Sequence, residues 1–156
     1  MSAEAIEPIG GRRHVRSRAA VAAAAGFVGL AAFELALALG APLGRAAMGG
    51  THTYLPAGLR IVSALAALVW PLAALVVLRR GGYRVPLIST RVARAGTWVL
   101  VSLLSLGVLM NLASSSGWER FLQAPITAIM LALCVLVARS RPEWRDGVQD
   151  VHTATA

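Results

Sequence analysis

The chain has 156 residues, of which 57% are hydrophobic and only 14% are charged. Soluble globular domains contain about 45–50% apolar and about 25% charged residues, so a soluble chain this short would leave much apolar surface in water. This composition, with a net charge of +8 and one cysteine, excludes a disordered tail, a disulfide scaffold and a multidomain soluble enzyme. It predicts a small polytopic membrane protein. The 15 basic residues are all arginine, and together with the abundant alanine this bias is typical of a GC-rich bacterial genome.

Four apolar stretches are long enough to cross a bilayer, whose core is about 30 Å thick and needs roughly 17–25 residues of helix. None of them alternates apolar and polar residues as a membrane strand would. We therefore predict an all-α fold: a four-helix bundle with up-down-up-down topology and spans over residues 19–39, 61–78, 96–113 and 122–138. Residues 1–18 are a basic N-terminal segment, and residues 139–156 are a tail.

The first span has an alternative interpretation as a secretory signal peptide, with a cleavage site at the small residues 36–38. Its apolar run is longer than the usual h-region of about 7–15 residues, and it contains Glu34. Both features favour a retained helix. Small residues on this span predict a surface for close helix contact, formed by Ala22, Ala25, Gly26 and Gly29. The pair Gly81-Gly82 predicts the end of the second helix.

The arginines are distributed unequally between the two sides of the predicted bundle. Twelve lie in the N-terminal segment, the loop between the second and third spans and the tail, whereas the other two loops hold Arg45, Arg60 and Arg120. This positive-inside bias predicts a bacterial inner-membrane protein with both termini in the cytoplasm. The same charge predicts contact with anionic lipid headgroups at the cytoplasmic face, a specific acidic partner being the alternative. Nucleic acid is not an expected partner, because no motif that reads or stacks on bases is present.

Several kinds of chemistry have no support in the sequence. One cysteine cannot form a CxxC redox pair, and Cys134 is expected to be a small buried apolar residue. No zinc, dinucleotide, P-loop or nucleophile-elbow motif occurs. We expect no cofactor, no bound metal and no catalytic residue. The histidines lie outside the predicted spans, which disfavours haem ligation: His14, His52 and His152.

Glu34 is the residue most suggestive of a site. A carboxylate within a span is costly, so it usually faces the bundle interior, a water-filled cavity or a partner. Glu34 lies six residues before Gly40, or about 9 Å along the helix axis. It is interpreted either as a proton- or cation-linked carboxylate or as a structural group that pairs with Arg60. Other polar residues predicted near this depth are Ser63, Asn111, Gln123 and Thr127, with Arg120 nearer the rim.

The first outer loop, residues 40–59, is the longest on its side and is interpreted as a binding loop or as a cover over the mouth of the bundle. Within it, His52 is a candidate pH-sensitive group. The candidate binding residues are therefore Glu34, Arg60, Asn111, Arg120 and His52.

A set of short motifs resembles those of small bacterial four-helix membrane proteins to which no activity is assigned. The resemblance covers roughly residues 20–140 and supports the four-span topology, but it supplies no substrate and no catalytic role. The motifs that carry it are Gly40-Ala41-Pro42-Leu43-Gly44, Gly49-Gly50, Leu55-Pro56, Leu59-Arg60, Asn111-Leu112-Ala113-Ser114, Trp118-Glu119-Arg120-Phe121 and Pro125.

Three functions are compatible with the sequence. The first is a non-catalytic integral membrane protein whose outer polar cluster serves packing or partner docking. The second is a small transporter or ligand-binding membrane protein that uses Glu34, and it would require a homo-oligomer or a larger membrane partner because four short helices leave little room for an aqueous path. The third is a lipid-modifying or quinone-linked enzyme, which no motif favours.

Overall fold

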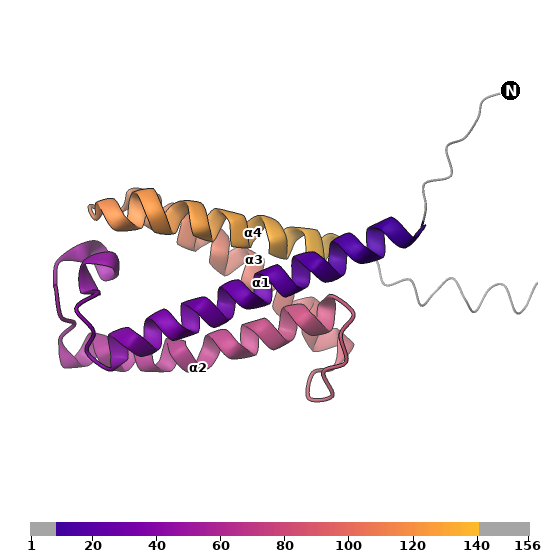
Figure 1. Cartoon of the computed structure of the whole chain (residues 1–156), viewed down its shortest axis with the longest axis horizontal. Helices are drawn as coiled ribbons and strands as arrows, with labels where there is room; N and C mark the ends of the chain where they lie inside the picture. Colours follow the sequence, from indigo (N-terminus) through magenta and orange to yellow (C-terminus); the bar gives the residue numbers. More distant parts are fainter. Residues whose placement is uncertain (1–8, 141–156) are drawn as a thin grey trace, which may run out of the picture.

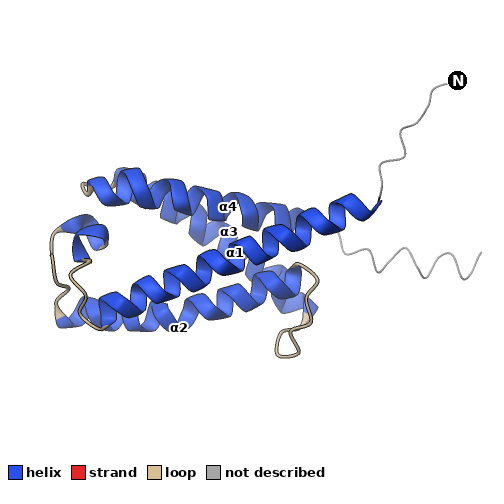
Figure 2. Cartoon of the chain, viewed as in Figure 1, coloured by secondary structure: helices blue, strands red, loops and turns tan. Residues whose placement is uncertain are grey.

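The computed structural model describes residues 9–140, and within this range helices joined by loops form all of the regular secondary structure, with no strand (Figures 1 and 2). The predicted all-α fold is confirmed for these residues. The predicted N-terminal segment lies partly outside them, and the tail lies almost entirely outside. The elements are α1 (Ile9–Ala38), η1 (Gly44–Ala46), η2 (Met48–Gly50), α2 (Ala57–Arg80), α3 (Thr90–Ala113), η3 (Glu119–Gln123) and α4 (Ala124–Arg139).

Four helical segments are long and apolar enough to cross a membrane, with lengths of 25, 24, 24 and 21 residues. They are His14–Ala38, Ala57–Arg80, Thr90–Ala113 and Glu119–Arg139. Most ends extend beyond the predicted spans, because a span read from hydropathy stops at the first charge whereas arginine is a good helix former. His14, which we expected outside the spans, lies within the first segment.

The helix boundaries follow from local sequence. Ser89 caps the start of α3, since its hydroxyl accepts a hydrogen bond from the backbone N–H of Val92 at 3.2 Å. The predicted stop after α2 is confirmed: Gly81 follows the last helical residue, and Gly82 adopts a φ of +103°, which glycine tolerates best. Pro125 lies in the first turn of α4, where a missing N–H costs no helical bond.

The helices pack as two antiparallel pairs. α1 lies mainly against α2 and α3 mainly against α4, while contacts between α1 and α4 and between α2 and α3 join the pairs (Figure 1). At one end the start of α1 meets the end of α4, where Ala19 and Ala20 form a buried cluster with Val137. We call this the terminal end, and it also contains the loop from α2 to α3. The opposite end, with residues 40–56 and η3, is the distal end.

Small side chains on α1 allow close packing in the main core. Ala23 and Ala24 are buried there with Phe27, whose ring stacks on Trp70 at 5.7 Å between centroids and 12° between planes. Cys134 is fully buried in the same cluster, as expected. The remaining buried members are Ala73, Ala74, Val77, Leu100, Leu104 and Met130.

The prediction that four small residues of α1 form a surface for close helix contact is largely wrong. Only Gly26 lies against another helix, where a Cβ would be 3.1 Å from Cε of Met130. Ala22, Ala25 and Gly29 are exposed, and a Cβ on Gly29 would meet no atom within 4 Å. The helix is apolar nearly all round, so periodicity could not select its buried face.

Candidate binding site

Two polar side chains face each other between α1 and α2. Because these helices are antiparallel, Glu34 lies two turns beyond Phe27 and Ser63 lies two turns before Trp70, which brings Ser63 beside Glu34. Ser63 is fully buried, with 0% of its surface exposed. The hydroxyl of Ser63 and Oε2 of Glu34 are both shielded from solvent and complete no hydrogen bond of normal geometry, although the hydroxyl lies close enough to interact with the carboxyl group. Buried polar atoms are nearly always satisfied, so these two atoms are among the few exceptions in the described residues.

Arg60 does not pair with Glu34. Its Nε donates a hydrogen bond to the carbonyl of Ala38 at 2.9 Å, and its guanidinium lies against Gly40, where a Cβ would be 3.3 Å from Cζ. A cation at a helix C-terminus satisfies a free carbonyl and interacts favourably with the helix dipole. Arg60 therefore caps α1, and it leaves the carboxylate of Glu34 without an ion pair.

An apolar cluster covers this pair on the distal side. Leu37, one turn beyond Glu34, is fully buried against Ala47 and Leu55 from the loop. Phe33 and Leu59 pack around the same cluster. We call these five residues the apolar plug. The apolar plug thus begins one turn from Glu34, on the side of the distal end.

Side chains that the sequence analysis did not include among the candidate binding residues connect the loop to the start of the last span. The backbone N–H of Gly49 donates a hydrogen bond to Oε1 of Glu119 at 2.7 Å. The hydroxyl of Ser116 donates to the carbonyl of Arg45 at 2.9 Å, and Nε2 of Gln123 donates to the carbonyl of Ala46. These bonds connect the α1–α2 pair to the α3–α4 pair at the distal end, and Glu119 is 7% exposed.

The signal for Glu119 was present in the sequence as the spacing Ser116-Gly117-Trp118-Glu119, which is that of a capping box. Ser116 does cap the helix, because its hydroxyl accepts from the N–H of Glu119 at 3.4 Å and its carbonyl accepts from the N–H of Arg120 at 3.0 Å. In a complete box the glutamate would turn back to the N–H of the capping residue. Here that N–H donates instead to the hydroxyl of Ser114, so the carboxylate of Glu119 is available for the loop.

The other candidates have separate contacts. Asn111 on α3 donates from Nδ2 to the hydroxyl of Thr127 on α4 at 3.3 Å. Arg120 donates to the carbonyl of Ser114 at 2.7 Å and is exposed, and the side chain of His52 is also exposed. The structure therefore places His52 in the loop and Arg60 in the first turn of α2. Asn111 lies between α3 and α4, and Arg120 lies in η3 at the distal end. The structure does not gather the five candidates around one ligand position.

Among residues 9–140 no group of three or more histidine, cysteine or acidic side chains could hold a metal ion. The polar pair instead offers a carboxylate and a hydroxyl in an apolar setting, which suits a proton or a cationic group.

Four apolar helices in this arrangement are compatible with a helical polytopic membrane protein. No protein-family model, curated protein or solved structure matches the chain. The resemblance to small bacterial four-helix membrane proteins accordingly stays a prediction.

Proposed function

We propose that the protein is a four-span integral membrane protein of the bacterial inner membrane that binds a proton or a cationic group at Glu34. The observation that carries this proposal is the half-buried carboxyl group of Glu34 beside the buried Ser63, in which Oε2 and the hydroxyl are shielded from solvent and complete no hydrogen bond of normal geometry. Both termini are proposed to lie in the cytoplasm.

The energetic argument starts from the cost of a carboxylate inside a membrane. Such groups are rare, and where they occur they are paired or line a functional pathway. Arg60 is in reach of the end of α1 but binds the carbonyl of Ala38. A purely structural carboxylate would be expected to use its hydrogen-bonding capacity within the bundle. Glu34 has the hydroxyl of Ser63 beside it but completes no hydrogen bond of normal geometry through Oε2, which supports a role for an exchangeable partner.

The proposed orientation rests on the arginines at the two ends. Within the described residues the terminal end carries exposed arginines on α1, α3, α4 and the α2–α3 loop, and both described acidic residues lie away from it. The positive-inside rule therefore favours a cytoplasmic terminal end and an external distal end. In that orientation the apolar plug and its loop separate Glu34 from the outside.

The test is binding of a fluorescent lipophilic cation to the purified protein in a neutral detergent. We expect saturable binding to the wild type and at least a tenfold loss of affinity in Glu34→Gln, because the amide has nearly the same shape but no charge. Glu119→Gln is the matched control, since it removes the other described carboxylate. Equal binding by all three proteins would overturn the proposal.

Thermal stability separates a binding role from a structural one. We expect Glu34→Gln to be at least as stable as the wild type from about pH 5 to pH 9, because a neutral amide costs less to bury than an unpaired charge. A clear loss of stability in Glu34→Gln would instead assign the carboxylate to packing, and the protein to the non-catalytic structural class.

A further inference from the structure

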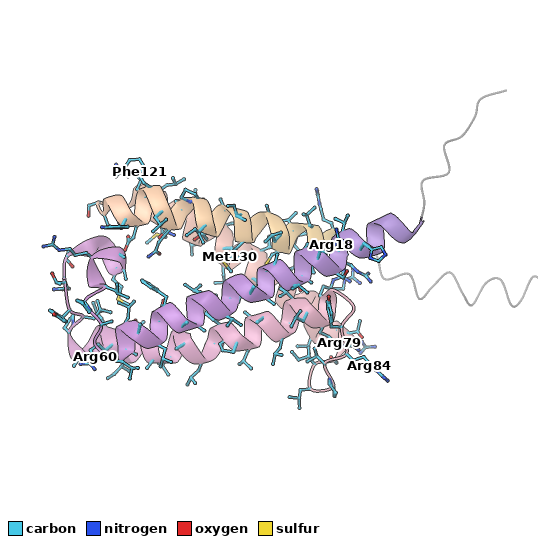
Figure 3. All side chains as sticks on the ribbon, viewed as in Figure 1. Arg18, Arg60, Arg79, Arg84, Phe121 and Met130 are labelled. Atoms are coloured by element: carbon cyan, nitrogen blue, oxygen red, sulfur yellow. The ribbon has the colours of Figure 1, made fainter. Side chains whose placement is uncertain are left out.

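The loop between α1 and α2, residues 40–56, lies between the two helix pairs at the distal end. In Figure 3 the labelled Arg60 lies on the side of α1 and α2, and Phe121 lies on the side of α4, with the loop between them. The loop packs apolar residues against the first pair and forms hydrogen bonds with side chains that precede or begin the last span. These two sets of contacts differ in chemistry, so they can be weakened separately.

The apolar plug lies one turn distal to Glu34 and Ser63 on both helices. Leu37 follows Glu34 by three residues on α1, and Leu59 precedes Ser63 by four residues on α2, so each lies on the same helix face as its polar neighbour. The two loop residues of the plug are buried against them. Ser63 has 0% of its surface exposed, so access to it from the distal end requires a movement of the chain there.

Three side chains hold the loop from the other side. Ser116, Glu119 and Gln123 form the hydrogen bonds with loop residues that are described above, and we call these three bonds the latch. The bond from the N–H of Gly49 to Oε1 of Glu119 measures 2.7 Å and has a carboxylate as its acceptor. Hydrogen bonds to ionised groups are roughly twice as strong as neutral ones. Glu119 is therefore the member of the latch whose removal should weaken it most.

The loop is anchored where it leaves α1 and has an uncommon backbone conformation in its middle. Nε of Arg60 donates to the carbonyl of Ala38, and its guanidinium lies against Gly40 at the start of the loop. Met48, beside the latch, has a φ of +52°, which is uncommon for a residue with a side chain. Such a conformation persists where surrounding contacts hold it. Loss of the latch should therefore release the middle of the loop while its first end stays on α1.

We infer that residues 40–56 form a lid that opens to admit the aqueous solution to Glu34 and Ser63, and that the latch sets how often the lid opens. Opening breaks the three bonds of the latch and separates the loop residues of the plug from Leu37, and the four long helices stay folded. The purpose of the lid rests on the proposed function, because a site that exchanges a proton or a cationic group needs access to water. Access to Ser63 can nevertheless be measured whether or not a cation binds.

The experiment measures that access with Ser63→Cys in the full chain, purified in neutral detergent. A small water-soluble methanethiosulfonate is added, and mass spectrometry follows modification of the introduced thiol. We expect slow modification with the latch intact and modification about tenfold faster when Glu119→Ala is added, because the rate follows the population of the open state. Glu119→Gln is the matched control. It removes the same charge but keeps an acceptor oxygen, so the introduced thiol should react nearly as slowly as with Glu119 present.

The natural Cys134 reports on folding in the same samples, because it is fully buried in the main core. It should stay unmodified while the introduced thiol reacts. Equal rates with and without Glu119→Ala would overturn the lid, and so would equal acceleration by Glu119→Ala and Glu119→Gln, which would trace the effect to charge. Modification of Cys134 as fast as that of the introduced thiol would show opening of the whole bundle and would also overturn the lid.

Hydrogen exchange of the chain without the introduced cysteine provides a second measurement if Ser63→Cys does not fold. Glu119→Ala should speed amide exchange across residues 44–50 and leave exchange in α2 unchanged, and unchanged exchange in the loop would overturn the lid. The two proposals can also fail separately. Access that depends on Glu119 without any cation binding by the wild type would overturn the proposed function alone. Cation binding that depends on Glu34, with access independent of Glu119, would overturn the lid alone.

Discussion

The carboxylate of Glu119 accepts a hydrogen bond from the backbone N–H of Gly49 at 2.7 Å, across 70 residues of sequence. The acceptor is buried at the start of the last span, and the donor lies in the loop between α1 and α2. Met48, Gly49 and Gly50 all have positive φ values, which the two glycines adopt readily but which are uncommon for a residue such as Met48. The Glu119 bond helps to stabilise that conformation and, through it, the apolar plug.

Replacement of Glu119 by alanine should therefore loosen the distal end. A hydrogen bond to a charged group contributes about 1.5–3 kcal/mol, and removing the acceptor also leaves the N–H of Gly49 unsatisfied. We expect a lower unfolding temperature in detergent and faster proteolysis within residues 40–56. Limited proteolysis with mass-spectrometric mapping measures the second effect.

Glu119→Gln is the conservative comparison, because its amide oxygen can still accept from Gly49. It should lose less stability than Glu119→Ala and keep the loop protected. If alanine left both the unfolding temperature and the cleavage pattern unchanged, the hydrogen bond would have no role in holding the loop.

Two glycines, Gly50 in this loop and Gly29 in α1, provide a matched pair of alanine substitutions. A Cβ on Gly50 would lie 2.9 Å from Cβ of Ser116, and its φ is +72°, whereas Gly29 has open space around it within α1. We expect Gly50→Ala to destabilise the protein by about 1–2 kcal/mol from backbone strain alone, with a steric penalty in addition. Gly29→Ala should be neutral or stabilising by about 0.5–1 kcal/mol, because alanine is the better helix former.

Unfolding curves of the two variants in the same detergent provide the measurement. The prediction concerns the order of the two effects, which does not depend on the absolute stability. A Gly50→Ala variant as stable as Gly29→Ala would mean that the loop and Ser116 do not approach each other as closely as the structure indicates.

The number and type of the helices could be predicted because the necessary information is local. An apolar run of sufficient length specifies a helix wherever it packs, and Gly81-Gly82 marks a helix end by its own conformational freedom. Glu34 was recognisable for the same reason, as a charge within an apolar run. Its neighbour Ser63 followed from the antiparallel arrangement of two adjacent spans.

Features that depend on distant backbone groups could not be predicted. Arg60 was expected to reach a carboxylate, but a carbonyl at the end of α1 was the nearer acceptor. The capping-box spacing of Glu119 was visible in the sequence, but it does not reveal the partner of the carboxylate, which is the backbone N–H of Gly49 rather than a side chain. The buried face of α1 was assigned wrongly because Ala22 and Gly29 differ little in hydropathy from the alanines that pack.

The bond between Asn111 and Thr127 predicts a measurable coupling between α3 and α4. Interhelical hydrogen bonds of this kind contribute about 0.6 kcal/mol on average within membranes. We expect Asn111→Ala and Thr127→Val each to lower stability slightly, and the double variant to lose less than the sum. A double-mutant cycle measured by unfolding in detergent quantifies the coupling, and strict additivity would show that the 3.3 Å contact contributes nothing.

The proposed orientation can be tested with single cysteines on opposite ends. Tyr54 in the distal loop is 64% exposed, and Leu87 in the α2–α3 loop is 90% exposed. If the distal end faces outward, a membrane-impermeant maleimide should label Tyr54→Cys in intact spheroplasts, whereas Leu87→Cys should be labelled only after permeabilisation. The natural Cys134 is buried, so the wild-type protein should remain unlabelled in both conditions and serves as the control. The reverse labelling pattern would invert the orientation, and it would place the exposed arginines of the terminal end on the outer side.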